Sequence, residues 1–412
     1  MPLTHADLVE AVTQDAAFRR RRRLQPVGGV GDMLFPPTYP GEDKNDPPRH
    51  VFERRRIAGK EDDVWCVLLD SVQSQANRME EALLEAARDG RLDLPRLAVD
   101  FAGAGLEALG EITSLDAPHR VFDAILRDSL LDGKPFPNSD LGQRLAKATA
   151  RDATPILEAS PTSLLFGVWN STGEGGGLGA KFARAVVSEI VGVNVPVENA
   201  RRHRRDEVPD VQTAARRTGS RIDPLGILRA VEVYKGPAGW DVTEKQAGKG
   251  AKKMRPSEIN HGNIAPSVDA LGITCDYAEQ TVVITLAGLR RLRFGGPSER
   301  DTAGRALIAA LGLVALLEQD AQGYALRSRC DLVCDGKADL ERVHADGTVE
   351  AITLTRDEAL ALYGEALVGA RRAGFTFADA PVMLTPQDKL VHIVRESMTR
   401  ALAGEAHPDD GE

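Results

Sequence analysis

Apolar and polar positions along this chain follow both helical and strand spacing, and the clearest pattern lies at residues 64–88. The apolar run from Val64 to Leu69 is typical of a short buried strand. Asp70 and Ser71 are helix-capping residues, and apolar positions then recur at 72, 76, 79, 83 and 86. The pattern therefore predicts a buried strand followed directly by an amphipathic helix.

The polar residues at the start of this helix are the first candidate site. Gln75, Asn77 and Arg78 fall outside the apolar stripe, so we expect them to face away from the core. Amides and a guanidinium at a helix N-terminus suit a phosphodiester or another anionic partner. A solvated helix start without a partner explains the same residues.

The remaining patterns alternate between helix and strand. Residues 1–24 predict a polar helix that ends in the arginines 19–23, and the Gly- and Pro-rich residues 25–49 predict irregular structure. We expect strands at 163–169, at 281–286 with an extension through Arg293, and at 324–333, and helices at 181–191 and 302–319. Beyond residue 335 the pattern indicates an acidic, mostly helical region.

These elements suggest an α+β chain with long insertions. We expect an N-terminal arm at 1–60, a core at 61–195 and 269–335, a basic insertion of hairpins and loops at 196–268, and an acidic C-terminal region at 336–412. Strand–helix–strand units of this kind suit a ferredoxin-like sheet. On the pattern alone, a doubly wound α/β fold remains an alternative.

Composition narrows the class of protein. With 412 residues and 42% hydrophobic content, the chain suits two or three domains, or one core with large insertions. The longest apolar run, at 306–317, is too short to span a bilayer, and no apolar segment follows the N-terminal arginines. We therefore expect a cytoplasmic protein.

The four cysteines form no disulfide framework. Cys330 and Cys334 are four residues apart, but the second Cys or His pair that a zinc site needs is not nearby.

Charge is unevenly distributed. The net charge is −9, yet residues 201–255 hold 14 Lys and Arg against 7 Asp and Glu, whereas residues 335–412 hold 8 against 15. Local patches, rather than the overall charge, determine where phosphates bind. A basic middle and an acidic end are consistent with RNA held on one part of the molecule.

The basic insertion supplies most of the candidate RNA-binding residues. They are cationic side chains whose binding to phosphates would release counterions: Arg201, Arg202, Arg204, Arg205, Lys252, Lys253 and Arg255. A single charge run is usually a solvated face, but several runs within 55 residues favour a binding surface. The polar turn that follows adds Asn260, His261 and Asn263, although a hydrogen-bonded turn histidine is the simpler interpretation of His261.

The Gly-rich segment at 172–179 precedes a predicted helix, as phosphate-binding loops do. It is no Walker A motif, because Phe182 stands where Ser or Thr would bind magnesium. Gly175, Gly177 and Ala180 loosely fit a dinucleotide-binding turn, with Glu198 near the expected acidic position. Backbone amides approaching RNA phosphates, assisted by Lys181 and Arg184, fit better.

Two further observations bear on RNA. Arg291 and Arg293 share one face if the strand extends that far, which would suit the RNA-facing side of a sheet. Aromatic residues are only 5% of the chain and paired stacking motifs are absent, so we expect phosphate and ribose contacts with little base readout.

The strings at 26–39 (PVGGVGDMLFPPTY), 69–78 (LDSVQSQANR), 160–169 (SPTSLLFGVW), 182–192 (FARAVVSEIVG), 255–263 (RPSEINHGN) and 289–294 (LRRLRF) together carry a family resemblance. In this order they resemble the repeated backbone subunit of type I-G (formerly I-U) CRISPR effector complexes, the Cas-seven group of the RAMP superfamily. The resemblance runs from about Gln25 to about Val333. It implies an RRM-like RAMP palm, and an inserted thumb that folds over the CRISPR RNA.

The leading hypothesis is a non-catalytic CRISPR RNA-binding subunit that polymerises along the guide and presents it to target DNA, without cofactor or metal. The resemblance implies as partners other copies of the chain, a large subunit and a fused Cas-five/Cas-six-type subunit. One alternative is a metal-dependent ribonuclease that uses Asp70, because related type III subunits cleave RNA with an aspartate. Another is a nucleotide-binding protein that uses residues 173–181.

Overall fold

A computed structural model describes residues 2–41, 49–170, 181–203, 206–211, 214–217, 224–262 and 268–402. Side chains are described for these residues except 197–217, 268–271 and 402. Both helices and strands occur along these ranges, so the fold is a mixed α+β structure.

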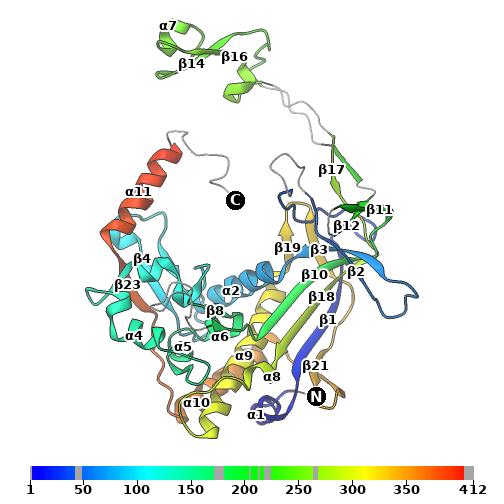
Figure 1. The fold of residues 1–412 in the computed structure, drawn as a ribbon, viewed down its shortest axis with the longest axis vertical. Helices are drawn as coiled ribbons and strands as arrows, with labels where there is room; N and C mark the ends of the chain where they lie inside the picture. The colour runs from blue at the N-terminus through cyan, green and yellow to red at the C-terminus, as the bar shows by residue number, and fades with distance from the viewer. Residues whose placement is uncertain are drawn as a thin grey trace.

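A large antiparallel sheet forms the centre of the molecule (Figure 1). Its strands follow the order β19–β20–β1–β18–β10–β3–β2, with β21 beside β1 and β22 beside β21. The bounds are β1 (Ala17–Pro26), β2 (Phe52–Arg55), β3 (Val64–Asp70), β10 (Val186–Val193), β18 (Tyr277–Thr285), β19 (Tyr324–Arg327), β20 (Cys330–Cys334), β21 (Leu340–Val343) and β22 (Val349–Ile352).

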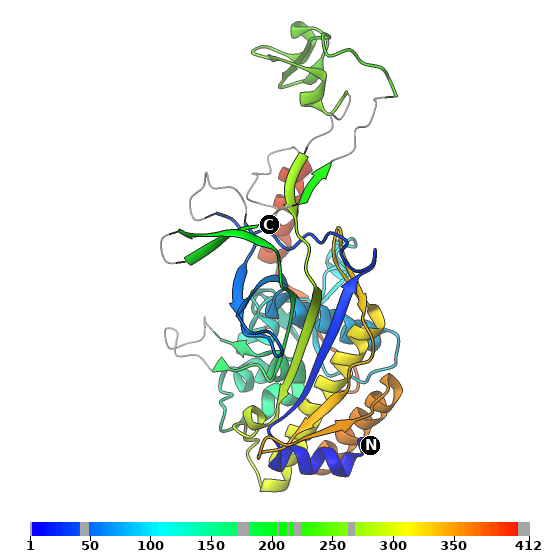
Figure 2. The same ribbon diagram turned by 90° about the vertical axis from the view of Figure 1, so that its right-hand side faces the viewer.

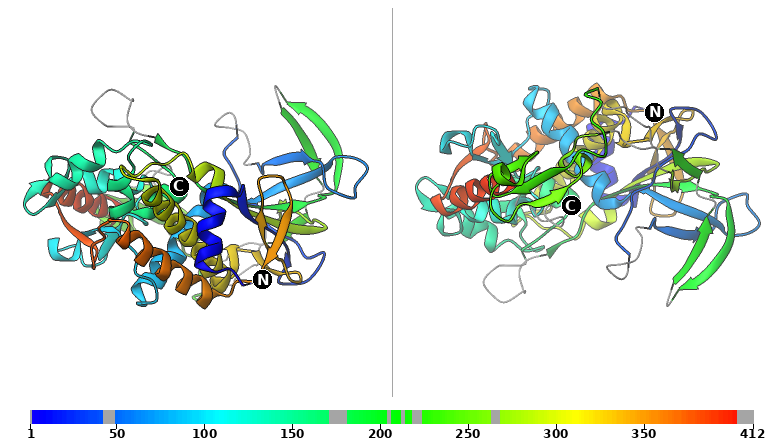
Figure 3. Two further views of the ribbon diagram at one scale, coloured as in Figure 1. Left: turned by 90° about the horizontal axis from the view of Figure 1, so that it is seen from below. Right: turned by 90° about the horizontal axis from the view of Figure 1, so that it is seen from above.

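Helices cover one face of this sheet. Buried residues alternate with half-buried ones along the whole of β18, as expected for a sheet that packs on one side. Figure 2 shows β1 and β18 in front with the helices beyond them, and seen from below α1 lies across α9 (Figure 3). The bounds are α1 (His5–Gln14), α2 (Val72–Arg88), α6 (Pro161–Phe166), α8 (Leu286–Leu289), α9 (Ser298–Gln322) and α10 (Arg356–Arg372).

A second sheet combines residues from the first half of the chain with residues near its end. Its order is β5–β4–β23–β6–β7, and β23 pairs with β4 in parallel. Its elements and their neighbours are β4 (Leu97–Asp100), β5 (Glu111–Thr113), η2 (Arg120–Phe122), α3 (Ala124–Arg127), β6 (Ser129–Leu131), β7 (Lys134–Pro135), η3 (Phe136–Asn138), α4 (Asp140–Ala146), α5 (Thr154–Ala159), β23 (Val382–Pro386) and α11 (Asp388–Leu402). The acidic C-terminal region thus contributes β21 and β22 to one sheet and β23 to the other.

In the described part of the predicted basic insertion, together with residues up to 272, there are three small antiparallel sheets. They are built from β11 (Val197–His203), β12 (Asp206–Val211), β13 (Ala214–Arg217), β14 (Val233–Gly236), β15 (Gly239–Asp241), β16 (Lys252–Met254) and β17 (Val268–Gly272). Together with α7 (Glu244–Ala247) and η4 (Pro256–Ile259), β14–β16 form what we call the distal lobe, residues 224–262. Figure 1 draws this lobe at the end of the molecule opposite α1.

The strand and helix predicted at 64–88 are present as β3 and α2, and Ser71 caps α2 by accepting from the backbone N–H of Ser74. The helix predicted at 302–319 is α9. Both predictions are confirmed. Each rests on a long apolar pattern with a single period.

The N-terminal prediction is wrong for the arginine run. Only His5–Gln14 is helical, and Arg19–Arg23 lie in β1, a central strand flanked by β18 on one side and by β20 and β21 on the other. Alternation places Arg20 and Arg22 on the side of the helices and the other three arginines on the opposite face. Acidic and polar residues far away in sequence pair with these side chains, so no local pattern could indicate the strand.

Two further predictions exchange helix and strand. The pattern at 163–169 predicts a strand, but Pro161–Phe166 is the short helix α6, with proline in its first turn and Gly167 at its end. The pattern at 181–191 predicts a helix, but these residues form β9 (Lys181–Phe182) and most of β10. β10 is rich in valine, and such β-branched side chains favour strands. The tiny strand β8 (Val168–Trp169) pairs with β9.

The last two strand predictions need new limits. β18 ends at Thr285 and the helix α8 follows, so Arg291 and Arg293 do not lie on a strand. Residues 324–333 form two strands, β19 and β20, joined by a tight turn in which Arg329 has a φ of 60°. A turn that uses a left-handed arginine lacks the usual Gly or Asn signal.

Candidate nucleic-acid interface

The start of α2 is organised around a buried carboxylate. Asp70, the last residue of β3, is fully buried. Its Oδ1 accepts from Ser74 Oγ at 2.8 Å and from Arg327 Nη2 at 3.1 Å. Its Oδ2 accepts from Gln75 Nε2 at 2.6 Å and from Arg78 Nε at 3.0 Å. Two guanidiniums and two neutral donors therefore surround this one carboxylate.

Gln75 belongs to the core, which corrects the prediction that it faces outward. Its side chain is fully buried. Besides donating to Asp70, its Oε1 accepts from Ser188 Oγ at 2.7 Å, from Gln280 Nε2 at 3.0 Å and from Gln319 Nε2 at 3.2 Å. A buried amide needs partners for both of its ends. β10, β18 and α9 supply them, so Gln75 joins α2 to the sheet.

Arg78 is half-buried and has a structural role. Its Nη1 and Nη2 donate to the carbonyls of Ala325 at 3.3 Å and Leu326 at 2.5 Å. Together with the bond to Asp70, these contacts fasten α2 to β19. Asn77 is exposed on the same helix. Of the three residues predicted here, Asn77 alone presents its side chain fully to solvent.

The arginines of β1 are paired on both faces of the sheet. On the helix side, Arg20 Nη2 donates to Asp320 Oδ1 at 2.8 Å and to Gln280 Oε1 at 3.0 Å. Arg22 forms an ion pair with the same aspartate at 2.9 Å and donates to Tyr324 Oη at 3.2 Å. Burial raises the pKa of Tyr324, so its hydroxyl remains protonated and donates to Asp320 Oδ1 at 2.6 Å.

On the opposite face of the sheet, acidic residues offset most of the positive charge. Arg19 pairs with Glu341 at 2.6 Å, and Arg21 pairs with Glu279 at 2.7 Å. The guanidinium carbon of Arg23 lies 4.3 Å from the ring centroid of Tyr277. This face therefore presents ion pairs rather than a free basic patch.

Lys181 and Arg184 follow the Gly-rich segment. That segment, residues 171–180, lies outside the described residues. Lys181 is exposed, and its Nζ lies 5.6 Å from the ring centroid of the half-exposed Trp169. Burial, and then the charge of Arg120, lower the pKa of Arg184. Because residues 181–182 and 186–193 form strands, the chain that follows the Gly-rich segment offers no helix N-terminus up to residue 193.

The neighbour of Arg184 is a buried ion pair that the sequence did not indicate. Arg120 donates to both carboxylate oxygens of Glu80, at 2.6 and 2.7 Å, and to the carbonyl of Gly167 at 2.8 Å. Arg120 has a φ of 49°, which is unusual for a residue with a side chain. The pair connects α2 to η2 and to the end of α6.

The distal lobe brings five predicted residues together. Lys252, Lys253, Arg255 and Asn260 are exposed, and His261 is half-buried. Lys253 forms an ion pair with Glu232 at 2.5 Å, and that hydrogen bond raises the pKa of the lysine. The His261 ring meets Trp240 edge-on at 5.6 Å. Its backbone N–H donates to the carbonyl of Pro256 at 2.8 Å, which fits the simpler interpretation of a hydrogen-bonded turn histidine.

The other predicted residues lie in separate places. Arg291 and Arg293 are exposed between α8 and α9, and Arg293 forms an ion pair with Asp301 at 3.3 Å. Arg201 and Arg202 lie in β11, but their side chains are outside the described set. Arg204, Arg205 and Asn263 are outside the described residues altogether.

Trp240 is an exposed aromatic residue of the distal lobe that was not among the predicted site residues. Trp240 is 51% exposed and lies in β15. The signal was the stretch Gly236-Pro-Ala-Gly239, a turn between two short strands that places the next residue on a hairpin.

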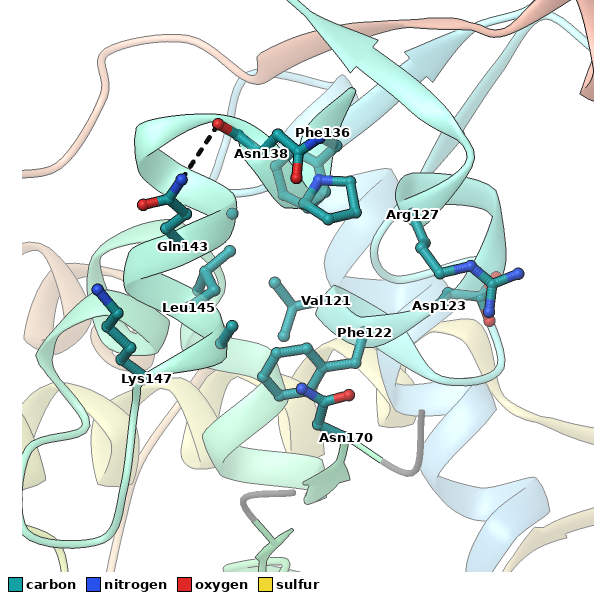
Figure 4. A pocket seen from close by; sticks show the side chains of 13 residues that line it. Val121, Phe122, Asp123, Arg127, Phe136, Asn138, Gln143, Leu145, Lys147 and Asn170 are labelled. Atoms are coloured by element: carbon teal, nitrogen blue, oxygen red, sulfur yellow. Dashed lines mark hydrogen bonds between the residues drawn. The ribbon is translucent and has the colours of Figure 1, made fainter. Parts of the chain in front are cut away.

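A cavity of about 540 Å³ lies beside the second sheet (Figure 4). Val121, Phe122, Phe136 and Leu145 give it an apolar lining. Its polar lining is formed by Asp123, Arg127, Asn138, Gln143, Lys147 and Asn170. None of the predicted site residues lines this cavity, which is therefore separate from the candidate interface.

Two classes of site find no support within the described ranges. No group of three or more His, Cys, Asp or Glu side chains there is arranged to hold a metal ion. No helix in those ranges is long and apolar enough to cross a membrane.

The fold and these residues describe an α+β protein with cationic side chains gathered in an insertion. Comparison with known families adds one finding: the model of a family described as CRISPR-associated protein GSU0053 (Cas_GSU0053) matches residues 18–197. The match begins in β1, ends at the start of β11, and indicates a CRISPR-associated protein. Among curated proteins, none matches the chain.

Proposed function

We propose that this chain is the CRISPR RNA-binding backbone subunit of a type I effector complex of subtype I-G. Several copies would polymerise along one guide RNA in the cytoplasm and present it for pairing with target DNA. The observation that carries the proposal is the family match over residues 18–197, which covers four strands of the central sheet, β1, β2, β3 and β10, and the helix α2.

The order of the strands supports an RRM-like palm. Along the chain, β1, α2, β10, β18, α9 and β20 occur in this sequence, and in space the four strands lie in the order β20–β1–β18–β10. Strand–helix–strand–strand–helix–strand with the first strand between the third and fourth is the ferredoxin-like arrangement. β2 and β3 extend this palm at one edge. The distal lobe and strands β4–β7 of the second sheet are insertions into the palm, and β23 of that sheet follows it in the chain.

Binding would depend on phosphate contacts. The exposed cations Lys181, Lys252, Arg255 and Arg291 and the exposed amide of Asn77 are available to RNA. Contacts of this kind hold a guide of any sequence and leave its bases free to pair. Affinity should therefore decrease steeply as salt rises.

The proposed subunit is not a nuclease. A metal-dependent ribonuclease needs a carboxylate with free lone pairs at the scissile phosphate. Asp70 is fully buried and accepts four hydrogen bonds from its neighbours, two of them from arginines. This geometry favours a structural role for Asp70, and target destruction would fall to a recruited helicase-nuclease.

The proposal is tested by isolating the protein from cells that carry a CRISPR array and its companion genes. We expect RNA of uniform guide length in a particle with several copies of this chain, together with the large subunit and the Cas-five/Cas-six-type subunit. Protein that remains free of RNA although the companion subunits are expressed would contradict the proposal. It would favour a small-molecule ligand at residues 173–181.

A further inference from the structure

Three side chains form one row across the small sheet of the distal lobe. In this sheet β14 lies between β15 and β16. The register places Lys235 of β14 directly opposite Trp240 of β15 and directly opposite Lys252 of β16. Residues directly opposite one another on antiparallel strands project from the same face, with Cβ atoms about 5 Å apart. An indole therefore lies in line with two ammonium groups.

Trp240 is exposed although it is the largest apolar side chain of the lobe. Its exposed fraction is 51%, whereas Val233 and Ala247 form the buried interior of the lobe. The ring of His261 meets the indole edge-on, with 5.6 Å between centroids and an interplanar angle of 64°. An edge contact fixes the orientation of the indole and leaves a ring face available to a ligand.

The charge environment of Lys235 and Lys252 differs from that of Lys253. Within the described residues, neither Lys235 nor Lys252 forms an ion pair with a carboxylate. Lys253 points to the other face of the sheet by strand alternation and is paired with Glu232 at 2.5 Å. Among the described residues, the face that carries Trp240 therefore has two unpaired cations, and the opposite face has its lysine offset.

We propose that the row Trp240–Lys235–Lys252 binds single-stranded RNA by stacking one unpaired base on the indole at its end, with the two lysines contacting phosphates of the same strand. Aromatic side chains on which bases stack, combined with cations that contact the backbone, are how proteins bind single strands without sequence preference, because every base has a π face. The proposal rests on the proposed RNA-binding function and adds a base contact to the phosphate contacts predicted there.

Full-length Trp240→Ala and Trp240→Phe variants test the stacking directly. The measurement is the affinity for a short unstructured RNA at fixed salt. The alanine variant should bind about tenfold more weakly, because stacking one base on an aromatic side chain is worth about 1–3 kcal/mol. The phenylalanine variant should retain most of the affinity. Leu228→Ala removes another exposed apolar side chain of the lobe, and affinity should not change.

An RNA of the same length with abasic sites separates stacking from other effects. Wild type and Trp240→Ala should bind it equally well, because it has phosphates but no base to stack. Among the lysines, Lys235→Ala and Lys252→Ala should each lower the salt dependence, whereas Lys245→Ala on α7, outside the row, should not.

Three outcomes would overturn the inference. If Trp240→Ala binds intact RNA as wild type does, the base contact is wrong, and the proposed function stands so long as wild type binds RNA. If the variant loses a companion subunit but keeps RNA, the surface binds protein instead. If wild type binds no RNA at all, the proposed function itself fails.

Discussion

At the scale of single residues, Asp70 is a fully buried carboxylate that accepts four hydrogen bonds. Its carboxylate is buried between two guanidiniums, and each of those groups holds a different element in place. Removing one partner of a buried ion pair leaves an uncompensated charge, which costs far more than losing a surface pair. Asp70 thus joins β3, α2 and β19.

Asp70→Ala should therefore lower the free energy of unfolding by about 3–5 kcal/mol, because Arg78 and Arg327 lose their buried partner. Chemical denaturation measures this change. Ser74→Ala removes only one neutral donor to the same carboxylate, and it should cost about 1 kcal/mol. Equal denaturation midpoints for Asp70→Ala and wild type would contradict the structural role.

The cysteines should differ in reactivity with iodoacetamide at pH 8. Burial, and then the charge of Asp276, raise the pKa of the partly buried Cys275 to about 12, and burial raises that of Cys330 to about 11. Both thiols stay protonated at pH 8, and the thiolate is the reactive species. Peptide mapping should find the exposed Cys334 modified first.

The same shifts set a direction for stability in alkali. The folded chain holds these two thiol protons more tightly than an unfolded chain, whose thiols titrate near 9.0. The folded state should therefore lose stability as the pH rises from about 9 towards 12.

The iodoacetamide prediction would be contradicted if Cys275 were modified before Cys334 at pH 8. That result would show that the Cys275 thiol is neither shielded nor protonated.

At the scale of elements, the join between α6 and β8 depends on a glycine. Gly167 has a φ of 83°, and a Cβ there would lie 2.8 Å from the backbone nitrogen of Arg184. Its carbonyl also accepts from Arg120. Backbone conformation and close packing both require glycine at this position.

Gly167→Ala should lower the free energy of unfolding by about 1–3 kcal/mol through backbone strain and steric overlap. Gly364→Ala is the matched control, because Gly364 lies inside the helix α10 and a Cβ there meets nothing within 4 Å. That variant should gain up to about 1 kcal/mol in helix propensity. Thermal unfolding compares the two, and shifts of equal sign would refute the argument.

The sequence predicted elements whose stability is local and missed those that depend on distant partners. α2 and α9 follow from periodicity and length. β1 could not be predicted, because the charge of Arg20 is offset by Asp320, 300 residues away. Gln75 was misplaced for the same reason, since its amide is satisfied by Ser188, Gln280 and Gln319.

Within the candidate site, the sequence predicted the cations Lys252, Lys253 and Arg255 of the distal lobe, and the structure shows that their side chains are exposed. It could not indicate that Lys253 is paired with Glu232, or that Trp240 shares a face with Lys252. Both facts depend on the register between strands, which a one-residue shift would reverse.

At the scale of the whole molecule, a net charge of −9 coexists with a basic insertion. Residues 335–412 have fifteen Asp and Glu against eight Lys and Arg, whereas the distal lobe has seven Lys and Arg against four Asp and Glu. This separation lets one part of the molecule attract phosphates while the rest repels them.

Neutralising Lys252, Lys253 and Arg255 together should weaken RNA binding and reduce its salt dependence. For single strands, removing one cation from a phosphate lowers the slope of log affinity against log salt by about 0.7. Because Lys253 is already paired with Glu232, we expect the slope to fall by the equivalent of about two phosphates rather than three. RNA affinity and salt slope that remain unaltered would show that the binding surface lies elsewhere.

The central claim is that several copies of this chain assemble along one guide RNA. It is tested most directly by native mass spectrometry of the particle purified from cells that express arrays with spacers of different lengths. The account predicts that the particle loses mass in whole steps of this chain as the spacer is shortened. A particle that holds the same number of copies at every spacer length, or a single copy, would contradict it.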